Sequence, residues 1–151
     1  MATPRWAQVQ LTLPPAKRGC HIITQRVTKA IEEPMRSIDV GIAHIFVQHT
    51  SCSLMLNENA DPHVRADMET FMTRVVPEGP SAPWQHTDEG YDDMPAHVKA
   101  AMFGSSLTLP IRNGRLALGT WQGVWLAEHR NEPTSRSLII TLQGMGGAPQ
   151  S

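Results

Sequence analysis

The stretch Ser106–Glu128, SLTLPIRNGRLALGTWQGVWLAE, decides the fold class. Strand-like segments at Ser106–Ile111 and Arg115–Leu118 flank Asn113-Gly114, and Gln122–Glu128 follows as a third. Asn-Gly between two such segments is the strongest short-range signal for a β-hairpin, because its tight turn needs positive φ at both central residues. This part of the chain therefore predicts antiparallel strands rather than a parallel sheet with crossover helices.

Further strands are predicted on both sides of this stretch. Trp6–Leu13 alternates between polar and apolar residues, as a half-buried strand does. Gly41–Gln48 is a short apolar run typical of a buried strand, and Ser53–Leu56 is expected to return beside it through a turn at His49–Cys52. Ser137–Gln143 completes about seven predicted strands.

Three helices are predicted from start signals, stop signals and periodicity. Asp61-Pro62 is a helix start, and apolar residues at helical spacing predict an amphipathic helix over residues 62–75. Thr24–Ile31 and Asp92–Phe103 are the other two, and Gly104 is the expected C-cap of the latter. The strands and helices together predict the α+β class. Pro77–Thr87, with three prolines, is predicted to be an irregular loop, either functional or merely connecting.

Size and composition exclude several classes of protein. A chain of 151 residues suits one domain, and a formal net charge of −1 argues against a general nucleic-acid-binding surface. No apolar stretch approaches the length of a membrane helix, and the N-terminus does not resemble a signal peptide. The two cysteines, Cys20 and Cys52, are expected to be free thiols in a reducing cytoplasm.

The first group of residues that could carry chemistry is Gln48–Ser53, a turn that combines an imidazole, hydroxyls and a thiol. Its hydroxyls and backbone amides suit an anion such as phosphate, but such side chains also serve to satisfy the turn's own backbone. Cys52 is interpreted as a small buried apolar residue rather than a nucleophile, because nothing in the sequence places a base against it.

The second group lies between His86 and His97. Two histidines and four carboxylates within twelve residues form a plausible ligand set for Zn²⁺ or another divalent ion. Asp93 and His97 are i and i+4, so they share one helix face. The alternative is an acidic helix start that complements the helix dipole, with a surface histidine nearby.

The third group follows the Gly119–Trp125 segment. Glu128 is a candidate buried acid at a strand end, and Arg130 and Arg136 could bind a phosphate through two parallel hydrogen bonds each. Both arginines could equally be solvated. The remaining histidines carry no supporting pattern and are interpreted as structural.

Three long motifs, taken in order, resemble one family. They are HTSCSLMLNENADP, HTDEGYDDMPAHVKAAMFGSSL and GRLALGTWQGVWLAEHR, and the resemblance to the YjbQ family extends from about Trp6 to Gly144. Members of that family carry the name secondary thiamine-phosphate synthase enzyme. The resemblance implies a single YjbQ-like domain over residues 1–151, built on an antiparallel β-sandwich and assembled as a homotrimer.

The resemblance also implies roles for particular residues. His49, Thr50, Ser51 and Glu128 would be catalytic, and Arg136 would bind an anion. The remaining set would bind a divalent metal ion, Zn or Mg: His49, His86, Asp93 and His97.

Several activities are consistent with these roles. The one implied by the family's name joins a pyrimidine diphosphate to a thiazole phosphate and releases pyrophosphate, so we expect an enzyme acting on a small phosphorylated metabolite. The alternatives are a metal-dependent phosphoester hydrolase and a metal- or metabolite-binding protein without turnover. Neither nucleic acid nor membrane is an expected partner.

Overall fold

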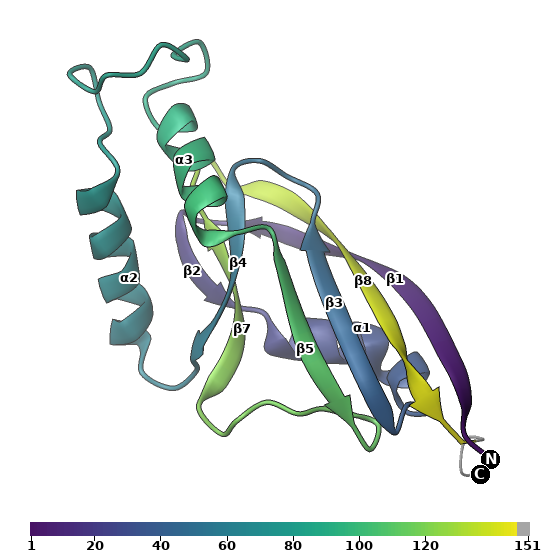
Figure 1. Ribbon diagram of the computed structural model, residues 1–151. Coiled ribbons are helices and arrows are strands. Elements are labelled where there is room, and N and C mark those ends of the chain that lie inside the picture. The colour runs from purple at the N-terminus through teal and green to yellow at the C-terminus, as the bar shows by residue number, and fades with distance from the viewer. Residues whose placement is uncertain (148–151) are drawn as a thin grey trace.

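Two antiparallel sheets face each other across one apolar core in the computed structural model, which describes residues 1–147 (Figure 1). The larger sheet has five strands, in the order β1 (Thr3–Ala16), β8 (Thr134–Gly146), β3 (Val40–Val47), β5 (Ser106–Arg112) and β6 (Arg115–Leu116). The smaller has the order β2 (Gly19–Ile22), β7 (Gln122–Glu128) and β4 (Cys52–Glu58). The described part of the chain also contains the helices α1 (Thr24–Met35), α2 (Pro62–Val75) and α3 (Asp93–Phe103). The predicted α+β class, with antiparallel sheets and three helices, is confirmed.

Local signals in the sequence account for the elements that were predicted well. Residues 113 and 114 have φ values of 50° and 75°, as the Asn-Gly turn between β5 and β6 requires. The Asp61 side chain accepts a hydrogen bond from the His63 N–H at the start of α2, and Gly104 (φ 98°) ends α3.

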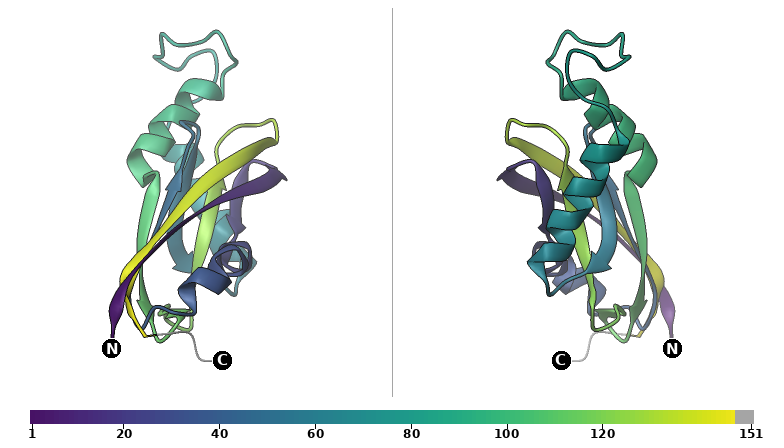
Figure 2. Two further views of the ribbon diagram at one scale, coloured as in Figure 1. Left: turned by 90° about the vertical axis from the view of Figure 1, so that its right-hand side faces the viewer. Right: turned by 90° about the vertical axis from the view of Figure 1, so that its left-hand side faces the viewer.

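The core lies between the sheets and is completed by α1. Val27, Ile31 and Met35 of α1 are buried against the inward-facing residues of both sheets, for example Ile45 and Leu126. In β1, β3 and β8 of the larger sheet, burial alternates from residue to residue over most of their length, so one face of each strand points to the core. β7 of the smaller sheet is instead buried on both faces. Figure 2 shows the long, twisted β1–β8 pair, and in Figure 1 α1 lies behind the larger sheet.

The expected pairing of Ser53–Leu56 with the strand before it is wrong. β3 pairs with β8 on one side and with β5 on the other, so it has no free edge for β4. The chain instead crosses from one sheet to the other at residues 48–51, and β4 pairs with β7. This crossing, which we call the sheet corner, carries His49, Thr50 and Ser51.

Two further expectations need correction. The short strand β2 was not predicted, and it pairs with β7 through only four residues. The amphipathic face predicted for α2 is largely not buried: Met72 is inaccessible, whereas Phe71 and Val75 are exposed to 50% and 45%. The helix packs mainly against the narrow strand β2, which is too small to cover a full apolar face.

Among residues 1–147, no helix combines the length and apolar content needed to cross a membrane.

Candidate functional site

The sheet corner is held by backbone hydrogen bonds to the ends of two strands. The Gln48 N–H donates to the carbonyl of Ser137 at 3.0 Å, and the His129 N–H donates to the carbonyl of Ser51 at 3.3 Å. Residues far apart in the sequence, from β3, β7 and β8, therefore meet at one end of the molecule. The helix α3 lies against the same corner, where His97 contacts the carbonyl of Thr50.

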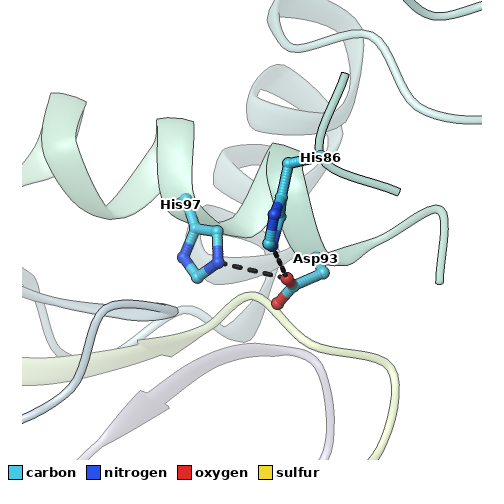
Figure 3. Close-up of side chains that lie close together, drawn as sticks. All are labelled: His86, Asp93 and His97. Carbon is cyan, nitrogen blue, oxygen red and sulfur yellow. Dashed lines mark hydrogen bonds and ion pairs between the residues drawn. The ribbon is translucent and has the colours of Figure 1, made fainter. Parts of the chain in front are cut away.

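A cluster of two histidines and one aspartate lies at the start of α3 (Figure 3). The Asp93 side chain is 1% exposed, and its Oδ2 lies 2.7 Å from Nε2 of His86 and 3.1 Å from Nε2 of His97. His97 is one helical turn after Asp93, as predicted, and His86 reaches the site from the long loop before α3. We call these three residues the His–Asp cluster.

The hydrogen bonding of His97 makes its free ring nitrogen an acceptor. Its Nδ1 lies 2.9 Å from the carbonyl oxygen of Thr50, and that nitrogen must carry the proton because a carbonyl can only accept. In the neutral ring, Nε2 therefore has a lone pair that faces a carboxylate oxygen of Asp93. Two acceptors at 3.1 Å repel unless a proton or a metal ion lies between them.

The second oxygen of Asp93 is held by Arg130. The guanidinium Nη1 donates to Asp93 Oδ1, and its Nε donates to Oδ2 of the neighbouring Asp92 at 2.9 Å. Burial alone would raise the pKa of Asp93, but the His86 hydrogen bond and the charges of His97 and Arg130 hold that pKa below its usual value. The carboxylate is therefore ionised and fixed in orientation.

This donor set fits a divalent transition-metal ion. The candidate ligand atoms of His86, Asp93 and His97 all lie within 4.8 Å of one another. Two imidazoles and one carboxylate are a common set for Zn²⁺ and related ions, with further coordination positions left for water or substrate. The backbone carbonyl that orients His97 and the arginine that orients Asp93 are typical outer-shell partners of metal ligands.

His49, the fourth predicted metal ligand, is placed differently. Its Nε2 accepts a hydrogen bond from the Ser137 N–H at 2.9 Å, so that nitrogen is occupied. Burial, and then the charge of Arg136, lower the pKa of His49, which favours the neutral ring. The structure therefore brings three of the four predicted ligands together and leaves His49 beside them.

A cavity of about 450 Å³ lies between His49 and His97, which is the one residue of the His–Asp cluster that lines it. Its lining consists of His49, Thr50, His97, Ala100, Ala101 and Ser105. The volume lies within the range of about 300–1,000 Å³ that small-molecule sites occupy. We call it the corner cavity.

Glu128, Ser51 and Arg136 form a second, closed cluster. Glu128 is inaccessible and Arg136 is 3% exposed. The guanidinium donates to both oxygens of Glu128, with 2.7 Å between Nε and Oε2, and its Nη2 donates to the Ser51 hydroxyl at 2.9 Å. Anion binding by Arg136 would therefore require the pair with Glu128 to open. Among the predicted catalytic residues, Ser51 and Glu128 lie in this closed cluster, whereas Thr50 lines the corner cavity.

The two cysteines are free, as expected. Cys52 is inaccessible, and burial raises the pKa of its thiol to about 12. It is therefore a buried thiol that stays protonated, in line with its interpretation as a small apolar residue.

Sequence reasoning missed the role of Arg130. It is neither solvated nor free for an anion, because it binds Asp92 and Asp93 and also the carbonyl of Glu89. These contacts join residues about forty positions apart, so neither spacing nor periodicity indicates them. Sequence reasoning also missed the burial of Lys99 and His129, for the same reason.

The chain is thus a small α+β protein with a candidate metal site beside a sheet corner. Residues 9–145 match the family described as UPF0047 protein YjbQ-like. The chain is 48% identical to the UPF0047 protein YjbQ of Escherichia coli O157:H7 over 139 residues, which cover 92% of this chain and 99% of that one. A UPF0047 protein of Synechocystis is 40% identical and covers 95% of each chain. The chain belongs to the YjbQ family.

Solved structures agree with this assignment. A YbjQ-like protein of unknown function from Sulfolobus solfataricus superposes with a TM-score of 0.82 at 25% identity, covering 94% of this chain and 99% of that one. A YjbQ/UPF0047 protein from Clostridium acetobutylicum gives a TM-score of 0.76 at 32% identity, covering 89% and 98%. The names of these relatives state a family and no activity.

Proposed function

We propose that this protein is a metal-dependent enzyme that acts on a small phosphorylated metabolite in the corner cavity. The observation that carries the proposal is the His–Asp cluster: two imidazole nitrogens converge on one oxygen of a buried, ionised carboxylate. His86, Asp93 and His97 would hold the ion. Nitrogen donors favour Zn²⁺ or a similar transition metal over Mg²⁺, which prefers oxygen ligands.

The ion and the protein would divide the chemistry between them. A divalent ion supplies Lewis acidity toward a phosphate oxygen and lowers the pKa of a bound water. His49 lines the same cavity with one ring nitrogen occupied by the Ser137 N–H, so its other nitrogen, Nδ1, carries the proton of the neutral ring. It can therefore donate a hydrogen bond to a ligand in the cavity. Arg130 keeps Asp93 oriented, and Thr50 does the same for His97.

Two reactions are consistent with this arrangement. The family resemblance implies thiamine-phosphate synthase activity, in which pyrophosphate leaves. Phosphoester hydrolysis is the second candidate. The number of protein ligands supports it, because three ligands leave one position of a four-coordinate ion open for the water that hydrolysis consumes. A binding protein without turnover is the third.

An assay of purified protein, prepared without a histidine tag and loaded with Zn²⁺, tests the proposal. One arm offers the pyrimidine diphosphate and the thiazole phosphate and measures thiamine phosphate and pyrophosphate. The other offers simple phosphoesters and measures inorganic phosphate. Turnover in either arm should disappear in the His86→Ala/His97→Ala variant and survive in a His63→Ala control, because His63 is an exposed residue of α2 that is far in sequence from the cluster. No turnover in either arm, with metal bound, would leave the binding-protein alternative.

We also propose that the protein self-associates, as a homotrimer by analogy with the family, through the outer face of the larger sheet. Figure 1 looks onto this face, and no helix crosses it. The outward positions of its four long strands carry no Asp, Glu, Lys or Arg between residues 6–12, 40–46, 106–110 and 137–145. Trp6, Ile42 and Phe46 are 65%, 40% and 41% exposed there. At the hairpin end of the same face, the paired and exposed residues Arg112 and Arg115 add positive charge. The remainder of the face has exposed large apolar side chains and no charged ones, which suits contact between identical subunits, because neither copy presents like charges to the other there.

Sedimentation at micromolar concentration tests this second proposal. The wild-type protein should sediment as a trimer, and Phe46→Glu should dissociate it, since each copy would then bury an unpaired charge. Phe71→Glu, on the exposed face of α2, is the matched control and should leave the assembly unchanged. A wild-type species of 16.7 kDa would contradict the proposal.

A further inference from the structure

The corner cavity continues the His–Asp cluster along one face of α3. Asp93, His97 and Ala101 follow one another at four-residue spacing, and Ala100 lies beside Ala101, so these side chains share that face. Nε2 of His97 faces back toward Asp93 (Figure 3), whereas the two alanines lie one turn further along the helix. Four residues advance a helix by about 6 Å, so a molecule held at the cluster can reach the cavity.

The two alanines make the helix side of the cavity small and apolar. Their methyl groups leave open the space that longer side chains would fill, and they carry no polar side-chain atom. Ala100 is half-buried and Ala101 is exposed, so a ligand can reach this surface from solvent. Apolar surface beside an open space suits the apolar part of a ligand.

The lining of the cavity offers a ligand neutral polar groups. Among residues 1–147 it includes no lysine, arginine, aspartate or glutamate. Burial, and then the charge of Arg136, lower the pKa of His49, so this imidazole is neutral at pH 7. The groups that can meet a ligand away from the cluster include the ring N–H of His49 and the hydroxyl of Ser105, both of which are uncharged.

The cations near this end of the molecule do not add charge to the cavity. Arg130 and Arg136 bind the buried carboxylates described above, and neither of them lines the cavity. Lys99 is next to Ala100 in the chain, but its side chain is inaccessible. An acid group placed inside the cavity would therefore lose water without gaining a cation, which is unfavourable.

We infer that the substrate is a phosphate ester whose organic part is uncharged and mainly apolar, such as an aryl or short alkyl group. This inference rests on the proposed function, because the ion at the His–Asp cluster would hold the phosphate. The organic part would lie against Ala100 and Ala101, and one hydroxyl or ring nitrogen of it could bind His49 or Ser105. A monoester of this kind fits the cavity, whereas a molecule with an acid group at each end does not.

Backbone-amide NMR titration of the Zn²⁺-loaded protein with three phosphonates tests the inference, because phosphonates keep the acid group and resist hydrolysis. Methylphosphonate presents the acid group almost alone, phenylphosphonate adds an apolar ring, and 4-phosphonobenzoate adds a charge at the far end of that ring. Phenylphosphonate should bind about tenfold more tightly than methylphosphonate, as expected for burying one ring. 4-Phosphonobenzoate should lose that gain.

A substitution on α3 identifies the surface that the ring contacts. Ala101→Leu fills the cavity from an exposed helical position, so it should weaken phenylphosphonate binding about tenfold and leave methylphosphonate binding unchanged. Ala66→Leu makes the same change at an exposed position of α2 that does not line the cavity, and it should alter neither affinity.

Benzyl alcohol separates the cavity from the metal site, because it is uncharged and needs no ion. At millimolar concentration it should cause saturable shifts at Ala100, Ala101 and Ser105, both in the wild type and in Asp93→Asn, which lacks the carboxylate ligand. Absence of phosphonate binding with these shifts intact would contradict the proposed metal site and still support an apolar cavity. Equal affinity for methylphosphonate and phenylphosphonate, tighter binding of 4-phosphonobenzoate, or no benzyl alcohol shifts at these residues would each overturn the inference.

Discussion

Glu128 and Asp93 are both buried carboxylates that contact an arginine, and they differ in what else surrounds them. Arg136 donates to both oxygens of Glu128, and both side chains are enclosed. Arg130 donates to only one oxygen of Asp93, and the other faces two imidazoles that are 49% and 30% exposed. Arg136, which is always charged, neutralises Glu128. The two imidazoles that face Asp93 can instead give up a proton and bind a metal ion. The first arrangement is suited to holding the sheet corner together, and the second to binding.

The largest expected effect comes from breaking the closed cluster. Arg136→Met should lower the free energy of unfolding by about 3–5 kcal/mol, because it leaves the Glu128 carboxylate buried without a cation. Urea unfolding measures this, with Arg26→Met, an exposed position on α1, as a control expected to change stability by less than about 0.5 kcal/mol. A stable Arg136→Met protein with reduced affinity for phosphate would instead support the anion-binding role predicted from the sequence.

His129 extends the comparison to pH. It is inaccessible, its Nε2 lies 2.8 Å from the Ser53 hydroxyl, and burial, together with the charge of Lys99, lowers its pKa to about 3. In the unfolded chain His129 binds a proton near pH 6.5, whereas in the folded protein it stays neutral down to about pH 3. Proton binding therefore favours the unfolded state, and the free energy of unfolding falls as the pH drops from about 6.5 toward 3. Between about pH 6.5 and 5 the loss should be about 2 kcal/mol.

The matched variant for this pH effect is His129→Gln. Its amide can keep a hydrogen bond to Ser53 but does not titrate, so the dependence of stability on pH should become correspondingly flatter. Unfolding free energies of both proteins at several pH values give the answer. Parallel curves for the two proteins would show that His129 does not carry the proposed effect.

A smaller effect, of opposite sign, is expected at Lys99. Its side chain is inaccessible, and its Nζ has no hydrogen-bond partner within the described residues. Burial, and then the charge of Arg18, lower its pKa. Lys99→Met should therefore stabilise the protein by about 1 kcal/mol, or raise Tm by about 2–4 °C, because it removes a buried amine without a partner. Lys29→Met should not change Tm, and a loss of stability on Lys99→Met would mean that the amine has a partner such as buried water.

The parts of the fold that were predictable are those fixed by local chemistry. The Asn113-Gly114 turn, the cap at Asp61 and the Gly104 stop each depend on residues next to one another in the chain. The crossing at residues 48–51 was not predictable in this way. β4 cannot pair with β3 because β8 and β5 occupy both edges of β3. Those two strands are distant in the sequence, so local patterns do not reveal this.

The same distinction applies to the site. The Asp93–His97 pair follows from helical spacing, and the density of histidines and carboxylates between His86 and His97 already indicated His86. The partners of Arg130 and Arg136 could not be predicted, because the sequence does not show which carboxylate each guanidinium contacts. Only the fold places Arg130 against Asp92 and Asp93 and places Arg136 against Glu128.

In our proposal the His–Asp cluster binds a divalent ion, and the neighbouring acids Asp92 and Asp93 have different roles in it. Asp92 and Asp93 are adjacent, are both buried and both bind Arg130, but only Asp93 contacts the imidazoles. Metal content of untagged protein after loading with Zn²⁺ and dialysis, measured for wild type, Asp92→Asn and Asp93→Asn, tests this directly. We predict one ion per chain in the wild type and in Asp92→Asn, and none in Asp93→Asn at unchanged secondary structure. Equal metal content in the two variants, or no metal in the wild type, would contradict the claim.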